Sequence, residues 1–264
     1  MIENKKEFKL ISKKNPKSLL PNALTIFGVC LGLSSIKFAL DTNYTMAIIA
    51  IGFAAILDTL DGRVARLIKG TSKVGKELDS LTDVISFGVA PGFIMYFWAL
   101  NEIGKFGWMF VLIYTVCCAL RLARFNLMII EENETWKINF FEGVPSPAAA
   151  GLVLLPLILS LSDLIQFENY AVLSSIAILA TSFLMVSKIP TYSLKRIIIP
   201  RHLAIFLLLG IGIYVSLLIF YTFVTLFFTG LVYLTLMPIS YFHYRYKSKT
   251  SSISTSEEEA EDVL

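Results

Sequence analysis

Long apolar runs alternate with short polar segments along the whole chain. Most of the runs approach or exceed the length of about 20 residues that a helix needs to cross a bilayer. Apolar residues are continuous within each run rather than alternating with polar ones, which favours spanning helices over a β-barrel. We therefore expect about eight transmembrane helices, at residues 21–40, 44–67, 77–100, 105–129, 148–161, 170–187, 203–220 and 222–244.

Composition supports a membrane protein. Of 264 residues, 56% are hydrophobic, and the mean hydropathy is +0.70. The expected fold class is an all-α polytopic helical bundle formed by one transmembrane domain, residues 19–246. A basic juxtamembrane leader, residues 1–18, precedes it, and an acidic tail, residues 247–264, follows and is predicted to be disordered. The leader is polar and lacks a small-residue cleavage site, so no cleavable signal peptide is expected.

The distribution of positive charge predicts the orientation. Lysine and arginine gather in the leader, in the segments 69–76 and 188–201, and at the start of the tail. With eight spans, all four segments fall on one side of the membrane, which the positive-inside rule makes cytoplasmic. The prediction is an N-in, C-in protein of the cell inner membrane. The bilayer is its expected partner, and no nucleic acid is expected.

Four aspartates interrupt the apolar pattern between the second and third runs. Asp58 and Asp61 are three residues apart, and Asp79 and Asp83 are four apart, so each pair shares one helix face. Each carboxylate at membrane depth costs about 3 kcal/mol on insertion scales. The short connection, residues 68–75, predicts antiparallel neighbouring helices whose carboxylates converge near one membrane surface. Two divalent cations would balance them, and hard oxygen ligands favour Mg²⁺ or Mn²⁺.

Small residues near the aspartates leave room for a ligand. Gly62 and Ala65 lie one turn beyond Asp58 and Asp61, and Gly75 lies one turn before Asp79. Arg66, one turn beyond Gly62, could meet a phosphate. A two-metal site of this kind stabilises in-line displacement at phosphorus. Spacing alone leaves two alternatives open. The carboxylates could simply pair with Arg63, Arg66 and Lys69, or they could form part of an ion pathway in a transporter.

The acidic stretch resembles a known family at every fixed position. Asp58-x-x-Asp61-Gly62-x-x-Ala65-Arg66, eight further residues, and Gly75-x-x-x-Asp79-x-x-x-Asp83 match the signature of the CDP-alcohol phosphotransferases. The resemblance implies that the four aspartates hold two divalent cations, Mg²⁺ or Mn²⁺. It implies that the CDP group is lined by Gly62, Ala65, Arg66 and Gly75. It also implies that Asp83 is the base for the acceptor hydroxyl.

Four less specific motifs indicate which members of the family the chain resembles most. The segments 86–92, 121–126, 141–151 and 186–195 resemble bacterial membrane-integral phosphatidylserine synthases. This implies transfer of a phosphatidyl group from CDP-diacylglycerol to L-serine, giving phosphatidylserine and CMP, in a homodimer. The nearest alternative is a sister enzyme that uses glycerol 3-phosphate or inositol phosphate, whose phosphorylated acceptors should need a denser basic pocket. An ion transporter, the more distant alternative, would need polar residues across the whole bilayer.

Two basic regions are candidates for binding the acceptor or a phosphate. Arg121 and Arg124 lie one turn apart near the end of the fourth run, where an arginine fork could bind the serine carboxylate. They could equally be positive-inside anchors or partners of the aspartates. A loop that could cover the site contains Lys188, Tyr192, Ser193 and Lys195. The alternative for this loop is a solvated basic segment.

Overall fold

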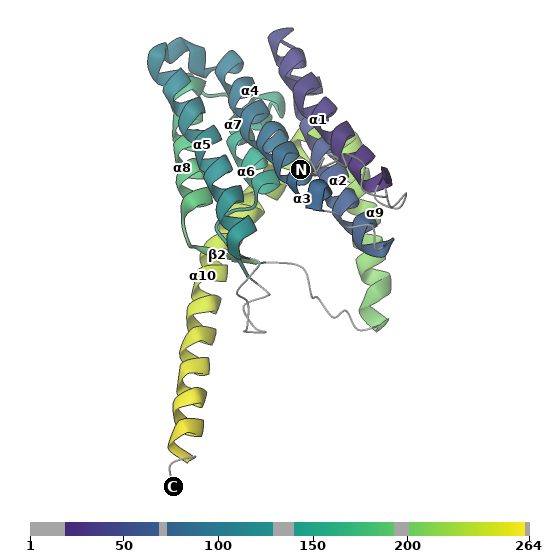
Figure 1. Ribbon diagram of the computed structural model, residues 1–264. Coiled ribbons are helices and arrows are strands. Elements are labelled where there is room, and N and C mark those ends of the chain that lie inside the picture. Colours follow the sequence, from purple (N-terminus) through teal and green to yellow (C-terminus); the bar gives the residue numbers. More distant parts are fainter. Residues whose placement is uncertain (1–18, 69–72, 129–139, 193–200, 262–264) are drawn as a thin grey trace, which may run out of the picture.

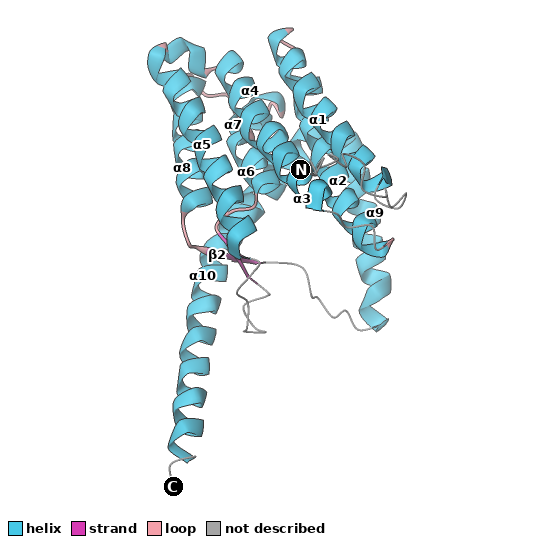
Figure 2. Cartoon of the chain, in the orientation of Figure 1, coloured by secondary structure: helices cyan, strands magenta, loops and turns pink. Residues whose placement is uncertain are grey.

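The computed structural model describes residues 19–68, 73–128, 140–192 and 201–261, and these form an almost entirely helical protein (Figures 1 and 2). The first half contains α1 (Leu19–Leu40), α2 (Tyr44–Leu67), α3 (Lys73–Asp83), the π-helical turn η2 (Val84–Val89), α4 (Ala90–Trp98), the 3₁₀ turn η3 (Leu100–Ile103) and α5 (Lys105–Met128). The second half contains β1 (Phe140–Glu142), α6 (Ser146–Val153), α7 (Leu155–Leu161), α8 (Tyr170–Val186), β2 (Pro190–Tyr192), α9 (Arg201–Phe220) and α10 (Thr222–Glu261).

Six helices of the described chain are long and apolar enough to cross a bilayer. They are α1, α2, the composite of α3, η2 and α4, and then α5, α9 and α10. The remaining apolar helices are shorter: α8 has 17 residues, and α6 and α7 have 8 and 7. The predicted polytopic all-α class is confirmed. The count of eight spans and the N-in, C-in orientation stay predictions.

Helix α1 packs against both α2 and α3. The sequence predicts that α2 and α3 are direct neighbours, but in the described chain neither is a major packing partner of the other. Small residues of α1 allow its close packing against the third span. A Cβ on Gly32 would lie 2.9 Å from the Cα of Ser86, so α1 approaches the backbone of η2 more closely than a side chain would permit. Close backbone approach of this kind is typical of membrane helices with small residues at the interface.

The π-helical turn begins directly after Asp83 and interrupts the third span. A π-turn leaves backbone carbonyls without their usual α-helical partners, and such turns are frequent at functional sites. Neighbouring side chains supply donors here. The hydroxyl of the fully buried Tyr114, in α5, donates to the carbonyl of Phe87 at 2.7 Å, and the hydroxyl of Thr115 donates to the carbonyl of Gly88 at 3.4 Å. The hydroxyl of Ser86, within the turn itself, donates to the carbonyl of Gly28 in α1 at 3.2 Å. The turn is therefore held from α1 and from α5.

The predicted fifth span is two short helices rather than one. Helix α6 ends at Val153 and α7 begins at Leu155, with Pro156 in its first turn. Proline has no backbone N–H to donate and its ring clashes with the preceding turn, which explains the interruption. A two-stranded antiparallel ribbon, which the sequence analysis does not predict, pairs Phe140 of β1 with Tyr192 of β2. It joins the segment before α6 to the segment after α8.

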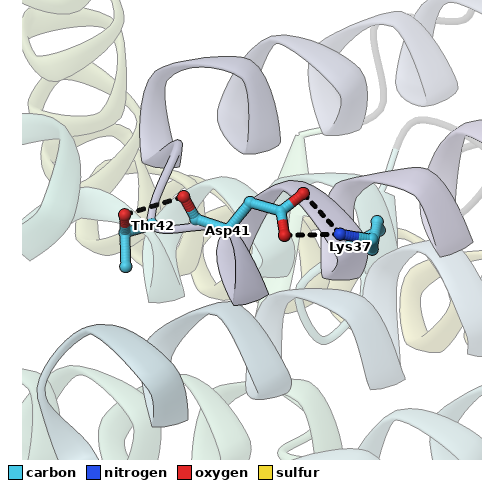
Figure 3. Close-up of polar contacts among 3 residues, drawn as sticks. All are labelled: Lys37, Asp41 and Thr42. Atoms are coloured by element: carbon cyan, nitrogen blue, oxygen red, sulfur yellow. Dashed lines mark hydrogen bonds and ion pairs between the residues drawn. The ribbon is translucent and has the colours of Figure 1, made fainter.

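The turn between α1 and α2 shows how the chain reverses (Figure 3). Lys37 and Asp41 form an exposed ion pair one helical turn apart. Thr42 takes a left-handed conformation with φ of 59°, and its hydroxyl donates to the carbonyl of Asp41 at 2.7 Å. The side chain of Asn43 then caps α2 by accepting from the amide of Met46 at 3.2 Å. Asparagine is among the preferred residues at this position.

The last two helices differ from the rest in exposure. None of the membrane-length window of α9 is buried within the protein, which for apolar residues indicates a surface that meets lipid or another protein. The hydroxyls of Tyr214 and Thr229 join α9 to α10 at 3.1 Å. Helix α10 extends beyond the bundle to Glu261 (Figure 1) and so includes most of the tail for which the sequence predicts disorder. Extending an existing helix avoids the cost of nucleation.

Candidate active site

Three of the four aspartates form a compact cluster. One carboxylate oxygen from each of Asp58, Asp61 and Asp79 lies within 4.8 Å of the others. Asp58 and Asp61 project from the same face of α2, and Asp79 projects from α3. Asp61 is only 4% exposed. The convergence predicted from helical spacing is therefore confirmed for these three carboxylates.

Asp61 is held by a residue from a third helix. The hydroxyl of Thr25, in α1, donates a hydrogen bond of 2.7 Å to Oδ2 of Asp61. Thr25 is itself 4% exposed, so the bond lies away from bulk water. The sequence analysis assigns no role to Thr25, because nothing in the local pattern links it to a residue 36 positions later.

Asp83 lies beside the cluster but is not a member of it. It is the last residue of α3, directly before the π-helical turn. Its Oδ2 accepts a hydrogen bond of 3.1 Å from the hydroxyl of Ser146, the first residue of α6. Its Oδ1 is buried and has no hydrogen-bond partner within the described chain. Oδ2 of Asp83 thus accepts from Ser146, whereas Oδ1 receives no hydrogen bond within the described chain, and the carboxyl group as a whole lies within hydrogen-bond reach of the carboxyl of Asp58.

The two arginines of α5 have different surroundings. Arg121 is 9% exposed, and its Nη1 donates to the hydroxyl of Ser146 at 3.4 Å. Its Nε is buried and without a hydrogen-bond partner among the described residues. Arg124 instead donates from Nη1 to the carbonyl of Val186 at 2.9 Å, at the last residue of α8, where a positive charge complements the helix dipole. Arg121 therefore shares Ser146 with Asp83, whereas Arg124 contacts the end of α8, and the roles of both arginines in binding the acceptor or a phosphate stay predictions.

The residues expected to line a CDP group lie on the same helices as the cluster. Gly62 and Arg66 are exposed on α2, Ala65 is half-buried beside them, and Gly75 is half-buried in α3. A Cβ added to Gly62 would meet no atom of the described residues within 4 Å. Packing among those residues therefore does not require the glycine, which leaves room for a ligand beside the backbone next to Asp61.

The loop candidates are only partly within the described chain. Lys188 is exposed at the end of α8, and Tyr192 is the last residue of β2. Ser193 and Lys195 lie outside the described residues. The ribbon itself is anchored, because the hydroxyl of Thr191 donates to the carbonyl of Gly143 at 2.8 Å. This hydrogen bond connects β2, at the start of the loop, with the segment directly before α6.

Two further polar residues near the aspartates escaped the sequence analysis. Ser146 and Asn126 both fall inside motifs noted for their resemblance, yet neither was selected as a site residue. The side-chain amide of Asn126 donates to the hydroxyl of Ser80 at 2.9 Å, joining the end of α5 to α3 next to Asp79. Both residues could have been selected from the sequence, because each is a polar residue inside a segment that resembles the family.

The carboxylate cluster fits a divalent cation. Within the described chain, none of the four aspartates forms an ion pair with Arg63 or Arg66, so pairing with these two arginines loses support. Lys69, the third partner of that alternative, lies outside the described residues. Three carboxylates at this separation would repel one another without a cation between them. Oxygen ligands of this type suit Mg²⁺ or Mn²⁺, and the buried, unpartnered Oδ1 of Asp83 leaves another acceptor nearby.

The fold and the site define a helical membrane enzyme with a carboxylate centre inside the bundle. The sequence model of the family described as "CDP-alcohol phosphatidyltransferase" matches residues 18–249. The chain therefore belongs to the CDP-alcohol phosphatidyltransferase family.

Three relatives are each named CDP-diacylglycerol–serine O-phosphatidyltransferase. The protein from Mycobacterium leprae is 35% identical over 86% of this chain and 76% of its own length. The protein from Helicobacter pylori strain 26695 is 40% identical over 69% of this chain and 76% of its own. The protein from Bacillus subtilis is 35% identical over 67% of this chain and 92% of its own.

Proposed function

We propose that this protein transfers a phosphatidyl group from CDP-diacylglycerol to the hydroxyl of L-serine, giving phosphatidylserine and CMP. The carboxylate cluster of Asp58, Asp61 and Asp79, with Asp83 beside it, carries the proposal. It supplies the ligand set that phosphatidyl transfer from a nucleotide diphosphate lipid needs. The shared name of the relatives selects serine as the acceptor.

In this mechanism Asp58, Asp61 and Asp79 would hold the divalent cations. The CDP group would be lined by Gly62, Ala65, Arg66 and Gly75. Bound cations would neutralise the pyrophosphate of the donor and the charge that grows on the departing CMP. Asp83 accepts the proton of the serine hydroxyl at Oδ1 while the serine oxygen attacks the β-phosphorus. The new bond joins serine to that phosphorus, and the bond to the CMP oxygen breaks. A further role of Asp83 as a cation ligand stays a prediction.

The buried side chain of Arg121, near Asp83, favours serine over phosphorylated acceptors. Of the lysines and arginines whose exposure is described, Arg121 is the one that is buried. One guanidinium suits a single carboxylate, whereas glycerol 3-phosphate or inositol phosphate would bring a doubly charged group. The distant transporter alternative is disfavoured because Asp58, Asp61 and Asp79 form one compact cluster rather than a path across the bilayer. Family membership also assigns the chain to phosphatidyl transfer.

The proposal also includes location and assembly. The loop charges support a site on the cytoplasmic face of the inner membrane, where water-soluble CDP and serine would reach the head group while the acyl chains stay in lipid. The homodimer implied by the resemblance remains a prediction. So do contacts with the acceptor or a phosphate by Arg124, Lys188, Tyr192, Ser193 and Lys195.

The test uses the purified full chain in detergent with CDP-diacylglycerol and Mn²⁺ or Mg²⁺. Labelled L-serine, glycerol 3-phosphate and inositol phosphate are offered separately, and lipid product and CMP are both measured. Of the three acceptors, only serine should give lipid product, together with an equal amount of CMP. Faster turnover with either phosphorylated acceptor would contradict serine as the acceptor. Asp41→Asn, at the exposed turn between α1 and α2, serves as the matched carboxylate control and should retain activity.

A further inference from the structure

Three helices meet at the side chain of Ser146. The residue begins α6 and is 1% exposed. Its hydroxyl lies 3.1 Å from Oδ2 of Asp83, at the end of α3, and 3.4 Å from Nη1 of Arg121, in α5. Ser146 lies 63 positions from Asp83 and 25 from Arg121 in the sequence. A single buried hydroxyl therefore connects the expected base with the buried arginine.

Hydrogen-bond chemistry fixes the direction of this chain of contacts. A guanidinium has only donors, and an ionised carboxylate has only acceptors. The serine hydroxyl has one proton, which must point to Asp83, while a lone pair of its oxygen faces Arg121. No other arrangement satisfies all three groups. Ser146 therefore occupies Oδ2 of Asp83 and leaves Oδ1, which has no hydrogen-bond partner within the described chain.

The backbone that carries Ser146 is held from several sides. Gly143 has a φ of +73°, and a Cβ there would lie 2.7 Å from the carbonyl oxygen of Met185. Its amide donates to the carbonyl of Ile189 at 2.9 Å, and its carbonyl accepts from Thr191. These bonds fasten the segment before α6 to the end of α8 and to β2. The backbone before Ser146 is thus held by hydrogen bonds to two other segments, as the supporting residues of a preorganised site require.

We propose that Ser146 is a positioning residue for phosphatidyl transfer. It holds the carboxylate of Asp83 in the one orientation that leaves Oδ1 for the acceptor hydroxyl, and it orients Arg121 beside that carboxylate. Arg121 keeps a buried Nε without a hydrogen-bond partner in the described chain, so it retains a donor for the acceptor's own carboxylate. The proposal rests on the proposed function, because it assigns the acceptor side of that same site.

The first test compares Ser146→Ala with Ser146→Thr and Ser146→Cys. Removing a hydrogen bond to a charged group should lower kcat roughly 10- to 100-fold. Binding of CDP-diacylglycerol, measured by calorimetry in detergent, should stay unchanged, because Asp58, Asp61 and Asp79 are untouched. Ser146→Thr restores a hydroxyl and should recover part of the lost kcat. Ser146→Cys keeps the size but has a weak donor, so its kcat should lie near that of Ser146→Ala.

Ser182→Ala is the matched control for loss of a buried serine hydroxyl. Ser182 is 3% exposed in α8, and its hydroxyl donates only to the carbonyl of Ile178, at 2.6 Å. This variant should keep the kcat of the unchanged protein. If Ser146 merely stabilised the fold, Ser146→Ala and Ser146→Cys would lose CDP-diacylglycerol binding and thermal stability together with kcat. That outcome, or an unchanged kcat in Ser146→Ala, would overturn the proposal.

A second test asks whether Ser146 acts through Asp83. In an Asp83→Asn background the carboxylate is already absent, so adding Ser146→Ala should lower kcat no further. If Ser146→Ala lowers kcat by the same factor with and without Asp83→Asn, the proposal is overturned. Failure of the proposed function has a different signature: the unchanged protein would then form no phosphatidylserine from serine at all. An active unchanged protein with an equally active Ser146→Ala variant refutes only the role of Ser146.

Discussion

The hydroxyl of Thr25 donates a hydrogen bond of 2.7 Å to Oδ2 of Asp61 and so joins α1 to the carboxylate cluster. Both residues are 4% exposed. A second residue that holds a metal ligand fixes the direction in which the ligand's lone pairs point. Helix α1 thus has a function beyond packing, because it orients one of the three carboxylates that would hold a cation.

Replacing Thr25 should weaken cation binding. Thr25→Val keeps the shape but removes the donor, so Asp61 loses its orientation. We expect the Mn²⁺ concentration for half-maximal activity to rise about 10-fold or more. The measurement is activity against Mn²⁺ concentration. Thr235→Val, which removes an exposed hydroxyl in α10 that donates only within its own helix, is the control. Identical Mn²⁺ dependence in the two variants would show that Thr25 does not position the site.

Removing the cation or its ligands should abolish activity. Excess chelator should stop turnover, and added Mn²⁺ or Mg²⁺ should restore it. Asp58→Asn and Asp79→Asn should each lose several orders of magnitude in rate, because an amide offers one neutral oxygen in place of a charged carboxylate. Asp41→Asn should be unaffected. Normal turnover in excess chelator would refute the cation mechanism, and a normal rate in one variant would remove that aspartate from the site.

Binding experiments should distinguish Asp83, the expected base, from Asp61, an expected cation ligand. Asp83→Asn should lose kcat while retaining CDP-diacylglycerol affinity, because Asp83 lies outside the compact cluster. Asp61→Asn should lose affinity as well, because Asp61 is a member of that cluster. Calorimetry of both variants in detergent with Mn²⁺ measures the difference. Equal loss of affinity would show that Asp83 is primarily a cation ligand, and the proton would then leave through water or the substrate phosphate.

Glycines in α1 and α2 should differ in their tolerance of a methyl group. A Cβ at Gly32 would lie 2.5 Å from the hydroxyl oxygen and 2.9 Å from the Cα of Ser86, so Gly32→Ala must push α1 away from η2. Overpacking of this kind costs about 1–3 kcal/mol. Gly52→Ala meets no atom within 4 Å and should be neutral or slightly stabilising. Thermal unfolding in the same detergent compares them. Equal midpoints would contradict the close approach of α1.

The predicted orientation can be tested at two exposed positions. Asn101 lies in the turn before α5, and Gln166 lies between α7 and α8. Single cysteines at these positions, introduced after Cys30, Cys117 and Cys118 are replaced, should react with an impermeant reagent from outside the cytoplasm. Arg245→Cys, at the basic end of the last span, should be protected in intact cells. Protection of Asn101→Cys or Gln166→Cys would contradict the N-in, C-in arrangement of eight spans.

Local patterns were sufficient for the helices and for most of the carboxylate cluster. Helical periodicity places Asp58 and Asp61 on one face of α2 wherever that helix packs, so their proximity follows from three-residue spacing alone. The apolar runs likewise predict α1, α2 and α5 within a few residues, because the bilayer demands continuous helices with internal hydrogen bonds. Asn43 and Asn169 precede apolar runs and do cap α2 and α8.

Contacts between distant segments were decided by tertiary packing. Thr25 with Asp61, and Ser146 with Asp83, join residues 36 and 63 positions apart. No local period relates such pairs, because their distance depends on how whole helices cross. The small face of α1 brings it against η2, and the ribbon between β1 and β2 brings Ser146 to Asp83. The sequence by itself determined which carboxylates share a helix face, whereas only the packing of α1, α5 and α6 decided which side chains hold them in place.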